Sequence, residues 1–427
     1  MKRHIFVKFS CCLLGALIFP LFLPVCAAQV YSIKKLPTLG GKARPWFPNL
    51  AYGINSSGQV TGCSPLNDLY YYDIFLWTPV AGMQDLGVEC SPGEGYNYPG
   101  GLNDLAHLTS ITDNHGNAEG FLWSAPGGFQ DLGTWVFPAG VNNLDQVTGG
   151  YVYNYPYRHA FFWTSEKGLQ DLGTLGGNES YAHGVNDAGQ VVGWSDTRNG
   201  YEAFLWSEST GMQAIPSLYS ANAINNQGMV AAYATSGHAA VWTQAGGTED
   251  LGVLPATSAS YAVALNNRGA VVGNSWPQNS RVGFAFLWSS TQGMINLNAL
   301  GKNKLQNWTA VGINDAGQIA VNRTDGQLLI LTPIIAIAVS SSQNPSQVGQ
   351  LVTFTATTSS IAGPPPDGEI ITFMDSNKIL GTAPLVGGSA TFSTASLSAG
   401  THKITASYPG DINYGSSQSK VLKQVVQ

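Results

Sequence analysis

Residues 180–215 read SYAHGVNDAGQVVGWSDTRNGYEAFLWSESTGMQAI, and this stretch predicts the fold because its phrases return along the chain. The phrase GVNDAGQVVG at Gly184 returns as GINSSGQVTG at Gly53, ALNNRGAVVG at Ala264 and GINDAGQIAV at Gly312. A recurrence at about 40 residues is typical of stacked or radial repeat proteins. We therefore expect one structural unit that is repeated along most of the chain.

Three landmarks count the copies of this unit. The Asn of the first phrase occurs seven times, at Asn55, Asn103, Asn142, Asn186, Asn225, Asn266 and Asn314. The Trp that ends the phrase AFLW occurs at Trp77, Trp123, Trp163, Trp206, Trp242 and Trp288, and Leu331 holds the seventh position. The Leu of the phrase DLG, or Ile in one copy, occurs at Leu86, Leu132, Leu172, Ile215, Leu251 and Leu297, and a further copy, Leu36, precedes the first Asn.

Each unit contains four short β-prone runs separated by turn residues, here named strands A to D. The Asn-x-x-Gly between strands A and B suits a tight hairpin, because Gly takes a positive φ without strain. Four antiparallel strands per unit predict the blade of a β-propeller. The last unit stops after its strand C, while the chain begins with a lone strand D at 31–36. Pairing these two ends would close the ring, so we expect an all-β fold with a seven-bladed propeller over residues 29–332, rather than an open solenoid.

The repeated phrases carry a family resemblance. HAFFW at His159, AFLW at Ala203 and Ala285, QDLGTLGG at Gln170 and the phrase at Gly184 resemble the extracellular HAF-repeat family over residues 30–332. The resemblance implies export of the protein and does not imply a reaction. Because the His of the family's phrase is retained only at His159 and His238, a His-dependent chemistry in every unit is not expected.

Residues 333–427 lack the repeated phrases, and their sequence predicts a second domain. Seven β-prone runs in under 100 residues indicate an immunoglobulin-like sandwich. VGQLVTFTA, ITFMD and SLSAGTHKITASYPGDINYGSSQS resemble the bacterial Ig-like repeat domains of surface and secreted proteins. That resemblance implies a spacer or adhesion module.

The N-terminal residues predict export. Lys2, Arg3 and Lys8 surround the start of an apolar run that ends in the small residues Ala27 and Ala28, which is the pattern of a signal peptide over residues 1–28. An uncleaved anchor and lipidation at Cys26 are the alternatives. We expect a secreted or cell-surface bacterial protein whose mature chain has no transmembrane span.

The remaining composition limits the chemistry. The net charge is −6, charged residues make up 10% and no basic run is present, so a nucleic-acid partner is not expected. In an oxidising compartment Cys63 and Cys90 can form a disulfide; two buried free thiols are the alternative. No cofactor and no metal site are expected. Calcium held by the Asn-Asp turns is a weaker alternative, because the Asp follows the Asn in only three of seven copies.

The spacing of the landmarks separates the two faces of the predicted disc. Since strands alternate in direction, the A–B and C–D turns share one face, the turn face, and the B–C and D–A connections share the other, the loop face. From Trp to the following Leu or Ile is nine residues in all six copies, whereas from Asn to Trp it varies from 17 to 22. The variation in length therefore falls on the loop face, where binding residues are expected on a rigid scaffold.

The loop face is also predicted to collect aromatic side chains. They are Tyr70, Tyr71, Tyr72, Tyr96, Tyr98, Trp135, Tyr151, Tyr153, Tyr155, Tyr157, Trp276 and Trp308. Flat rings with a polar edge suit sugars and other amphipathic ligands. Packing of these rings beneath the loops is the alternative for each of them.

We expect an exported, non-catalytic binding or adhesion protein, with an extracellular polysaccharide or a surface protein as its ligand. One alternative is a secreted glycosidase or lyase, because carboxylates also fall on the loop face. They are Asp68, Asp73, Glu89, Glu94, Asp113, Glu119, Asp196 and Glu202. The other alternative is a structural component of the cell envelope.

Overall fold

The computed structural model describes residues 31–43, 48–66, 71–90, 98–114, 117–280, 283–300, 307–360, 363–411 and 413–427. The predicted signal peptide, Cys26, Tyr70, Tyr96, Asp68 and Glu94 lie outside these ranges, and Asp113 is described by its backbone alone. The described chain is built from β-strands and one short 3-10 helix, η1 (Leu297–Leu300), so the fold is all-β. No helix within these ranges has the length and apolar character needed to cross a bilayer.

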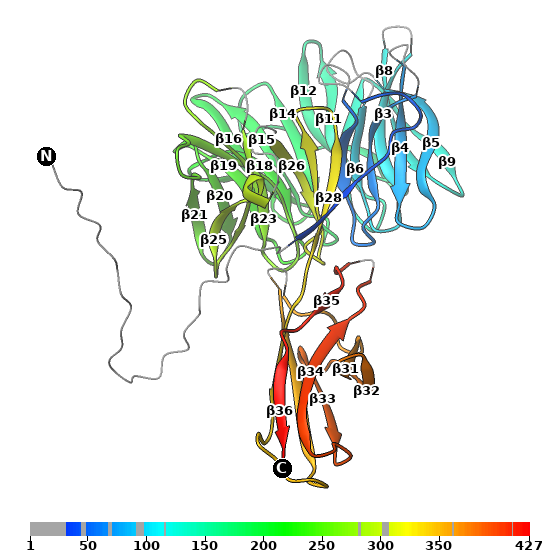
Figure 1. Ribbon diagram of the computed structural model, residues 1–427. Coiled ribbons are helices and arrows are strands. Elements are labelled where there is room, and N and C mark those ends of the chain that lie inside the picture. The colour runs from blue at the N-terminus through cyan, green and yellow to red at the C-terminus, as the bar shows by residue number, and fades with distance from the viewer. Residues whose placement is uncertain are drawn as a thin grey trace, which may run out of the picture.

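Seven four-stranded antiparallel sheets form the larger part of the molecule (Figure 1). Sheet 1 contains β2 (Leu50–Ile54), β3 (Val60–Pro65), β4 (Tyr72–Thr78) and β5 (Gly82–Glu89). Sheet 2 contains β6 (Tyr98–Leu102), β7 (Leu108–Asn114), β8 (Asn117–Ser124) and β9 (Gly128–Thr134). Sheet 3 contains β10 (Val136–Val141), β11 (Val147–Asn154), β12 (Tyr157–Thr164) and β13 (Gly168–Asp171).

The next three sheets repeat this order of strands. Sheet 4 contains β14 (Ser180–Val185), β15 (Val191–Thr197), β16 (Gly200–Ser207) and β17 (Gly211–Ile215). Sheet 5 contains β18 (Leu218–Ile224), β19 (Val230–Ala234), β20 (Ala239–Thr243) and β21 (Gly247–Gly252). Sheet 6 contains β22 (Ala259–Leu265), β23 (Val271–Trp276), β24 (Phe284–Ser289) and β25 (Gly293–Asn296).

Sheet 7 is assembled from the two ends of the repeat array. It contains β26 (Trp308–Ile313), β27 (Ile319–Arg323) and β28 (Leu328–Pro333), and its fourth strand is β1 (Tyr31–Lys35). β1 runs antiparallel to β28, with Tyr31 opposite Pro333 and Lys35 opposite Leu329. The pairing expected between the first strand and the last unit is therefore present.

The first strands of successive sheets lie next to one another, and β26 of sheet 7 also lies next to β2 of sheet 1. Small residues on these strands permit the close approach. A Cβ added to Gly140 would lie 3.0 Å from the carbonyl oxygen of His183 in the next sheet, so a larger residue would push the two strands apart. Each A–B pair also contains a register shift, as between Ala182 and Gly184 in sheet 4.

The Trp at the end of strand C packs between neighbouring sheets. Trp206 of sheet 4 is 4% exposed and belongs to a buried cluster that includes Phe162 and Leu172 of sheet 3. The ring centroids of Phe162 and Trp206 are 5.4 Å apart. Burial of such large rings between sheets supplies much of the hydrophobic stabilisation.

The chain after β28 forms an Ig-like sandwich of two sheets. The first contains β29 (Ala336–Ser341), β30 (Val352–Ser359) and β33 (Ser389–Thr394). The second contains β32 (Lys378–Pro384), β31 (Ile370–Asp375), β34 (Gly400–Tyr408) and β35 (Ser417–Gln418), and β36 (Leu422–Val426) also pairs with β34. The sequence predicts seven strands in this part of the chain, and the structure contains eight, β29 to β36.

The sandwich contacts the turn face of the repeat array. Its core begins at Ile335, only two residues after β28 ends, and the Gly415 N–H donates to the Pro333 carbonyl at 2.8 Å. Arg268, in the A–B turn of sheet 6, donates from Nη1 to the Tyr414 hydroxyl at 3.4 Å. Figure 1 shows the sandwich extending from this side of the seven sheets.

Candidate functional site

The exposed tyrosines and tryptophans of the described residues all lie at the loop face. They are Tyr71, Trp135, Tyr153, Tyr155, Tyr157, Tyr201 and Tyr219. Six of the seven come from sheets 3, 4 and 5 and from the connection that enters sheet 3, so they follow consecutive sheets. We call these six residues the aromatic arc. An exposed cluster of rings on one face is uncommon unless it contacts a partner.

The structure separates the twelve predicted aromatic residues into groups. Tyr71, Trp135, Tyr153, Tyr155 and Tyr157 are exposed, by 36% to 86%. Tyr98, Tyr151 and Trp276 are half-buried. Tyr72 and Trp308 are 3% and 4% exposed, because each begins a strand with its ring turned into the core, and these two leave the candidate set. Tyr70 and Tyr96 lie outside the described residues.

Two members of the arc were not among those twelve. Tyr201 is 55% exposed at the start of β16, and Tyr219 is 43% exposed near the start of β18. Tyr201 falls in a B–C segment, where the sequence does predict loop-face aromatics, whereas Tyr219 in the D–A segment was not predicted.

Trp135 is held in an unusual backbone conformation. It links β9 to β10 with a φ of 60°, in the left-handed region that bulky residues rarely adopt. Its N–H donates to the Ala118 carbonyl at 2.6 Å, and its own carbonyl accepts from the Val152 N–H at 3.0 Å. Such strain is found preferentially at binding and active sites, so we retain Trp135 in the candidate site.

Tyr153, His159 and Asp171 form a stacked group in sheet 3. The rings of Tyr153 and His159 are 4.1 Å apart and nearly parallel, at 6°. His159 Nδ1 lies 3.0 Å from Asp171 Oδ1, and the Gly173 N–H donates to the same oxygen at 2.9 Å. Burial, together with the Asp171 carboxylate, raises the pKa of the neighbouring Tyr151 to about 12.

The same His–Asp pair occurs once more in the array, in sheet 5. His238 Nδ1 lies 3.0 Å from Asp250 Oδ1, and the Gly252 N–H donates to Asp250 at 2.8 Å. Ser236, in place of a tyrosine, donates from its hydroxyl to Asp250 Oδ2 at 2.8 Å. The His of the repeated phrase therefore binds the Asp that follows it in the same sheet.

The predicted carboxylates lie in different sheets, and one group of them is close together. In sheet 1, Asp73 occupies the position that His159 has in sheet 3, and it pairs in register with Glu89. Asp85 occupies the position that Asp171 has in sheet 3. Burial, followed by the negative charge of Asp85 and Glu89, raises the pKa of Asp73 to about 6. Asp196 instead accepts a backbone hydrogen bond from Glu179 at 2.7 Å.

We expect this raised pKa to make stability depend on pH in a defined direction. Between about pH 4 and 6 the folded state holds a proton on Asp73 that the unfolded state has released, so stability falls as pH rises through this window. Asp73→Asn removes the effect. Relative to the wild type, the variant should gain up to about 1 kcal/mol between pH 4.5 and 7, since the site is partly screened by solvent.

Urea unfolding of both proteins at the two pH values measures this change. Glu249→Gln, on the outer strand of sheet 5, is the control for loss of one carboxylate. A difference between wild type and Asp73→Asn that stays constant with pH would contradict the prediction.

Cys63 and Cys90 are joined by a disulfide, with Cα atoms 5.9 Å apart. Cys63 lies in β3 and Cys90 directly follows β5, so the bond spans sheet 1 at its loop-face end. The Cys90 N–H also donates to the Tyr72 carbonyl at 2.8 Å. This link fixes the sheet beside Asp73 and Tyr71.

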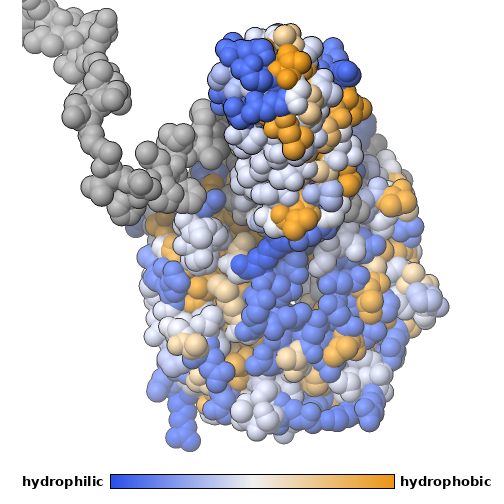
Figure 2. All heavy atoms as spheres, turned by 90° about the horizontal axis from the view of Figure 1, so that it is seen from below, coloured by the Kyte–Doolittle hydropathy of each residue, from blue (hydrophilic) through white to orange (hydrophobic). Residues whose placement is uncertain are grey.

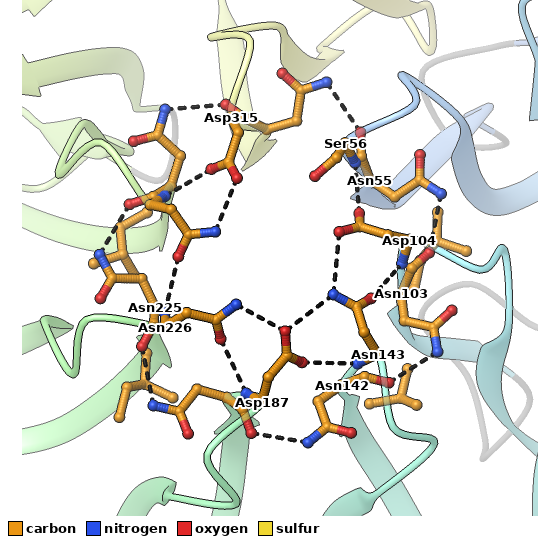
Figure 3. Close-up of a pocket in the computed structure, with 18 of the residues that line it drawn as sticks. Asn55, Ser56, Asn103, Asp104, Asn142, Asn143, Asp187, Asn225, Asn226 and Asp315 are labelled. Carbon is orange, nitrogen blue, oxygen red and sulfur yellow. Dashed lines mark hydrogen bonds between the residues drawn. The ribbon is translucent and has the colours of Figure 1, made fainter.

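The middle of the turn face carries a polar cavity of about 170 Å³. Its wall contains the seven repeated Asn residues, which are each at most 5% exposed. The side-chain Nδ2 of each donates to the backbone carbonyl of the Asn in the next sheet at 2.8–3.0 Å, and Asn314 completes the series by donating to Asn55 (Figure 3).

The residue after each Asn forms a second series of bonds. From Ser56 onward, the backbone N–H of this residue donates to the side-chain oxygen of its counterpart in the next sheet, at 2.7–2.9 Å over six steps. Asp104, Asp187 and Asp315 are acceptors in this series. In the described ranges no group of three or more His, Cys, Asp or Glu side chains is placed to hold a metal ion. Figure 2, viewed from the side of the sandwich, shows mainly hydrophilic residues around the middle of this face.

Comparisons with known proteins extend these observations. The model of the bacterial Ig-like domain, group 3, matches residues 339–427, which assigns the C-terminal sandwich to that class of domain. No curated protein matches the chain. The HAF-repeat resemblance remains a sequence-based interpretation.

Two solved structures are similar to this chain at low sequence identity. The extracellular domain of a protein described as a one-component system from B. thetaiotaomicron shares 10% identity, with 93% of this chain and 58% of that chain covered and a TM-score of 0.45. TolB from Acinetobacter baumannii shares 11% identity, with 65% and 64% covered and a TM-score of 0.36. The aligned region thus spans less than two thirds of either of those chains.

Proposed function

We propose that this chain is an exported, non-catalytic binding protein whose ligand lies across the loop face. The observation that carries the proposal is that every exposed Tyr and Trp of the described residues lies on that face. Tyrosine and tryptophan bind partners at low conformational cost, because each ring is large and rotates about only two bonds.

The proposed scaffold is a closed seven-bladed propeller of HAF-type repeats over residues 29–332, with an Ig-like module over 333–427. Three features support closure. β1 pairs with β28, β26 lies beside β2, and Asn314 donates to Asn55. A closed ring holds its loops at fixed separations, so the rings of the aromatic arc would be presented as one surface.

The attachment of the sandwich agrees with this arrangement. β28 is a C strand and ends on the turn face, where the sandwich contacts Arg268. The loop face is therefore left uncovered by the sandwich. We propose that the sandwich acts as a spacer and that export follows from the N-terminal 28 residues.

The ligand class is an extended polysaccharide or a protein of the cell surface, since the arc crosses three sheets. A glycan array and a peptide array probed with the full chain test the proposal. In Trp135→Ala/Tyr155→Ala/Tyr201→Ala we expect at least tenfold weaker binding with unchanged thermal unfolding, because aromatic residues dominate the energy of such interfaces.

Phe129→Ala is the matched control, because Phe129 is 43% exposed at the turn-face end of β9. Equal binding by the triple variant and the wild type would contradict the proposal. Release of reducing ends from a bound polysaccharide, lost in Asp73→Asn, would favour the enzyme alternative instead.

A further inference from the structure

We propose that Tyr153 is a preorganised platform on which the pyranose ring of an uncharged polysaccharide stacks. The inference rests on the proposed function and specifies both the ligand class and the residues that position the contact. Tyr153 would be the contacting residue, while His159 and Asp171 would hold it in place.

The first argument is that, among the described residues, ring contacts cover one face of the Tyr153 ring. His159 lies against that face at 4.1 Å and 6°, and Tyr151 meets the ring edge-on at 6.4 Å and 85°. Tyr153 is nevertheless 58% exposed. The ring therefore turns its second face outward, and its orientation is fixed from behind and from the side.

The second argument is that the supporting imidazole is itself fixed. His159 Nδ1 lies 3.0 and 3.1 Å from the two Asp171 carboxylate oxygens. Asp171 is fixed in turn by the Gly173 N–H. The side chain of His159 is 14% exposed, so it is a support rather than a contact. A ring that is already ordered loses little entropy when a ligand stacks on it.

The third argument is that further rings surround the platform. Tyr155 and Tyr157, which are 86% and 39% exposed, continue the same hairpin. The backbone of Trp135 is bonded to Val152, next to Tyr153 in the chain. Several rings around one hairpin suit a ligand with repeating flat units.

The chemistry of the surroundings favours an uncharged sugar. Between Asn117 and Glu166 the sequence contains one Lys or Arg, Arg158, whose guanidinium lies 4.2 Å from the Phe137 ring centroid, and sheet 4 adds Arg198 in its B–C connection. An acidic polysaccharide would need more cations than this. A proline-rich peptide would need a slot between rings, whereas His159 at stacking distance leaves no slot behind Tyr153. The apolar face of a pyranose needs only the outward face of the ring.

Sheet 5 supplies a matched comparison within the chain. It keeps the His238–Asp250 pair but has Ser236 bonded to that Asp, so the pair folds without a stacked tyrosine. Tyr153→Ser places a serine beside the His–Asp pair of sheet 3, the residue type that accompanies the pair in sheet 5. It removes the ring of the platform and keeps both residues of the pair.

Affinity electrophoresis of the full chain in gels containing barley β-glucan, galactomannan, alginate or no polysaccharide tests the proposal. A proline-rich peptide is tested separately by fluorescence anisotropy. We expect retardation by β-glucan or galactomannan, at least tenfold weakened in Tyr153→Ser. Tyr153→Phe should retain most of the affinity, since it keeps the ring. Asp171→Asn should retain more affinity than Asp171→Ala, because an amide oxygen can still hold His159.

The outcomes separate this inference from the proposed function. If Tyr153→Ser binds as the wild type does while the triple variant of the arc does not, the platform is wrong and the binding face stands. If only alginate or the peptide binds, the ligand class is wrong. If no probe binds, or if no variant of the arc changes binding, the inference is overturned, and in the latter case the proposed function falls with it.

Discussion

Deletion of residues 31–35 is expected to remove most of the stability of the seven-sheet array. Without β1 the outer edge of β28 loses its partner from Leu329 to Pro333. The buried ring of Tyr31, 4% exposed, is lost as well. Loss of one buried aromatic and several ladder hydrogen bonds costs about 5 kcal/mol, which is comparable to the total stability of many domains.

Guanidinium unfolding, monitored by tryptophan fluorescence, measures this effect. Ser32→Ala is the control, since it alters an exposed side chain of the same strand and leaves the strand in place. A synthetic peptide of residues 29–37 should restore part of the lost stability when it is added in excess, because it can pair with β28. A truncated chain with an unchanged midpoint would contradict the assigned role of β1.

Replacement of both cysteines, as Cys63→Ser/Cys90→Ser, is expected to lower stability by about 3 kcal/mol. The disulfide closes a segment with a sequence separation of 27, and constraint of the unfolded chain over such a length accounts for this magnitude. The same loss should follow when the wild type is unfolded in the presence of a reductant.

The double variant is its own control for the reductant. Because it has no disulfide to lose, its midpoint should be the same with and without dithiothreitol. Equal midpoints for the oxidised wild type and the double variant would show that the bond does not contribute. Binding at the aromatic arc should survive in the variant under conditions where it remains folded, since Cys63 and Cys90 lie in sheet 1.

The sequence carried enough information to predict the array of strands. The Asn landmark marks each A–B turn, and its Oδ1 accepts from the N–H groups two and four residues later, as at Ser57 and Gln59 for Asn55. Glycine stands three residues after the Asn in five of the seven copies. Ala106 and Asp145 occupy that place in two copies with φ of 63° and 57°, so the bonds of the Asn hold the turn even without glycine.

The contacts between sheets could not be predicted in the same way. The local turn explains the hydrogen bonds that each Asn Oδ1 accepts. The Nδ2 group of the same Asn donates to a carbonyl about 40 residues away, and that contact exists only after the sheets have assembled. The platform at Tyr153 likewise depends on His159 lying opposite Tyr151 in register. The sequence also could not predict which individual rings are exposed, since Tyr71 and Tyr72 are neighbours and only Tyr71 is exposed.

The hydrogen-bond series of the seven Asn residues has a consequence for how such a molecule can change in evolution. Each sheet offers a donor in one direction and an acceptor in the other, and every junction uses the same two groups. A duplicated unit would therefore bring compatible connectors at both of its borders. For the same reason new termini at any junction would keep these connectors, provided that one sheet is still completed by strands from both ends. Gain, loss and permutation of units would keep this Asn bond at each junction, and diversity can accumulate in the connections on the opposite side.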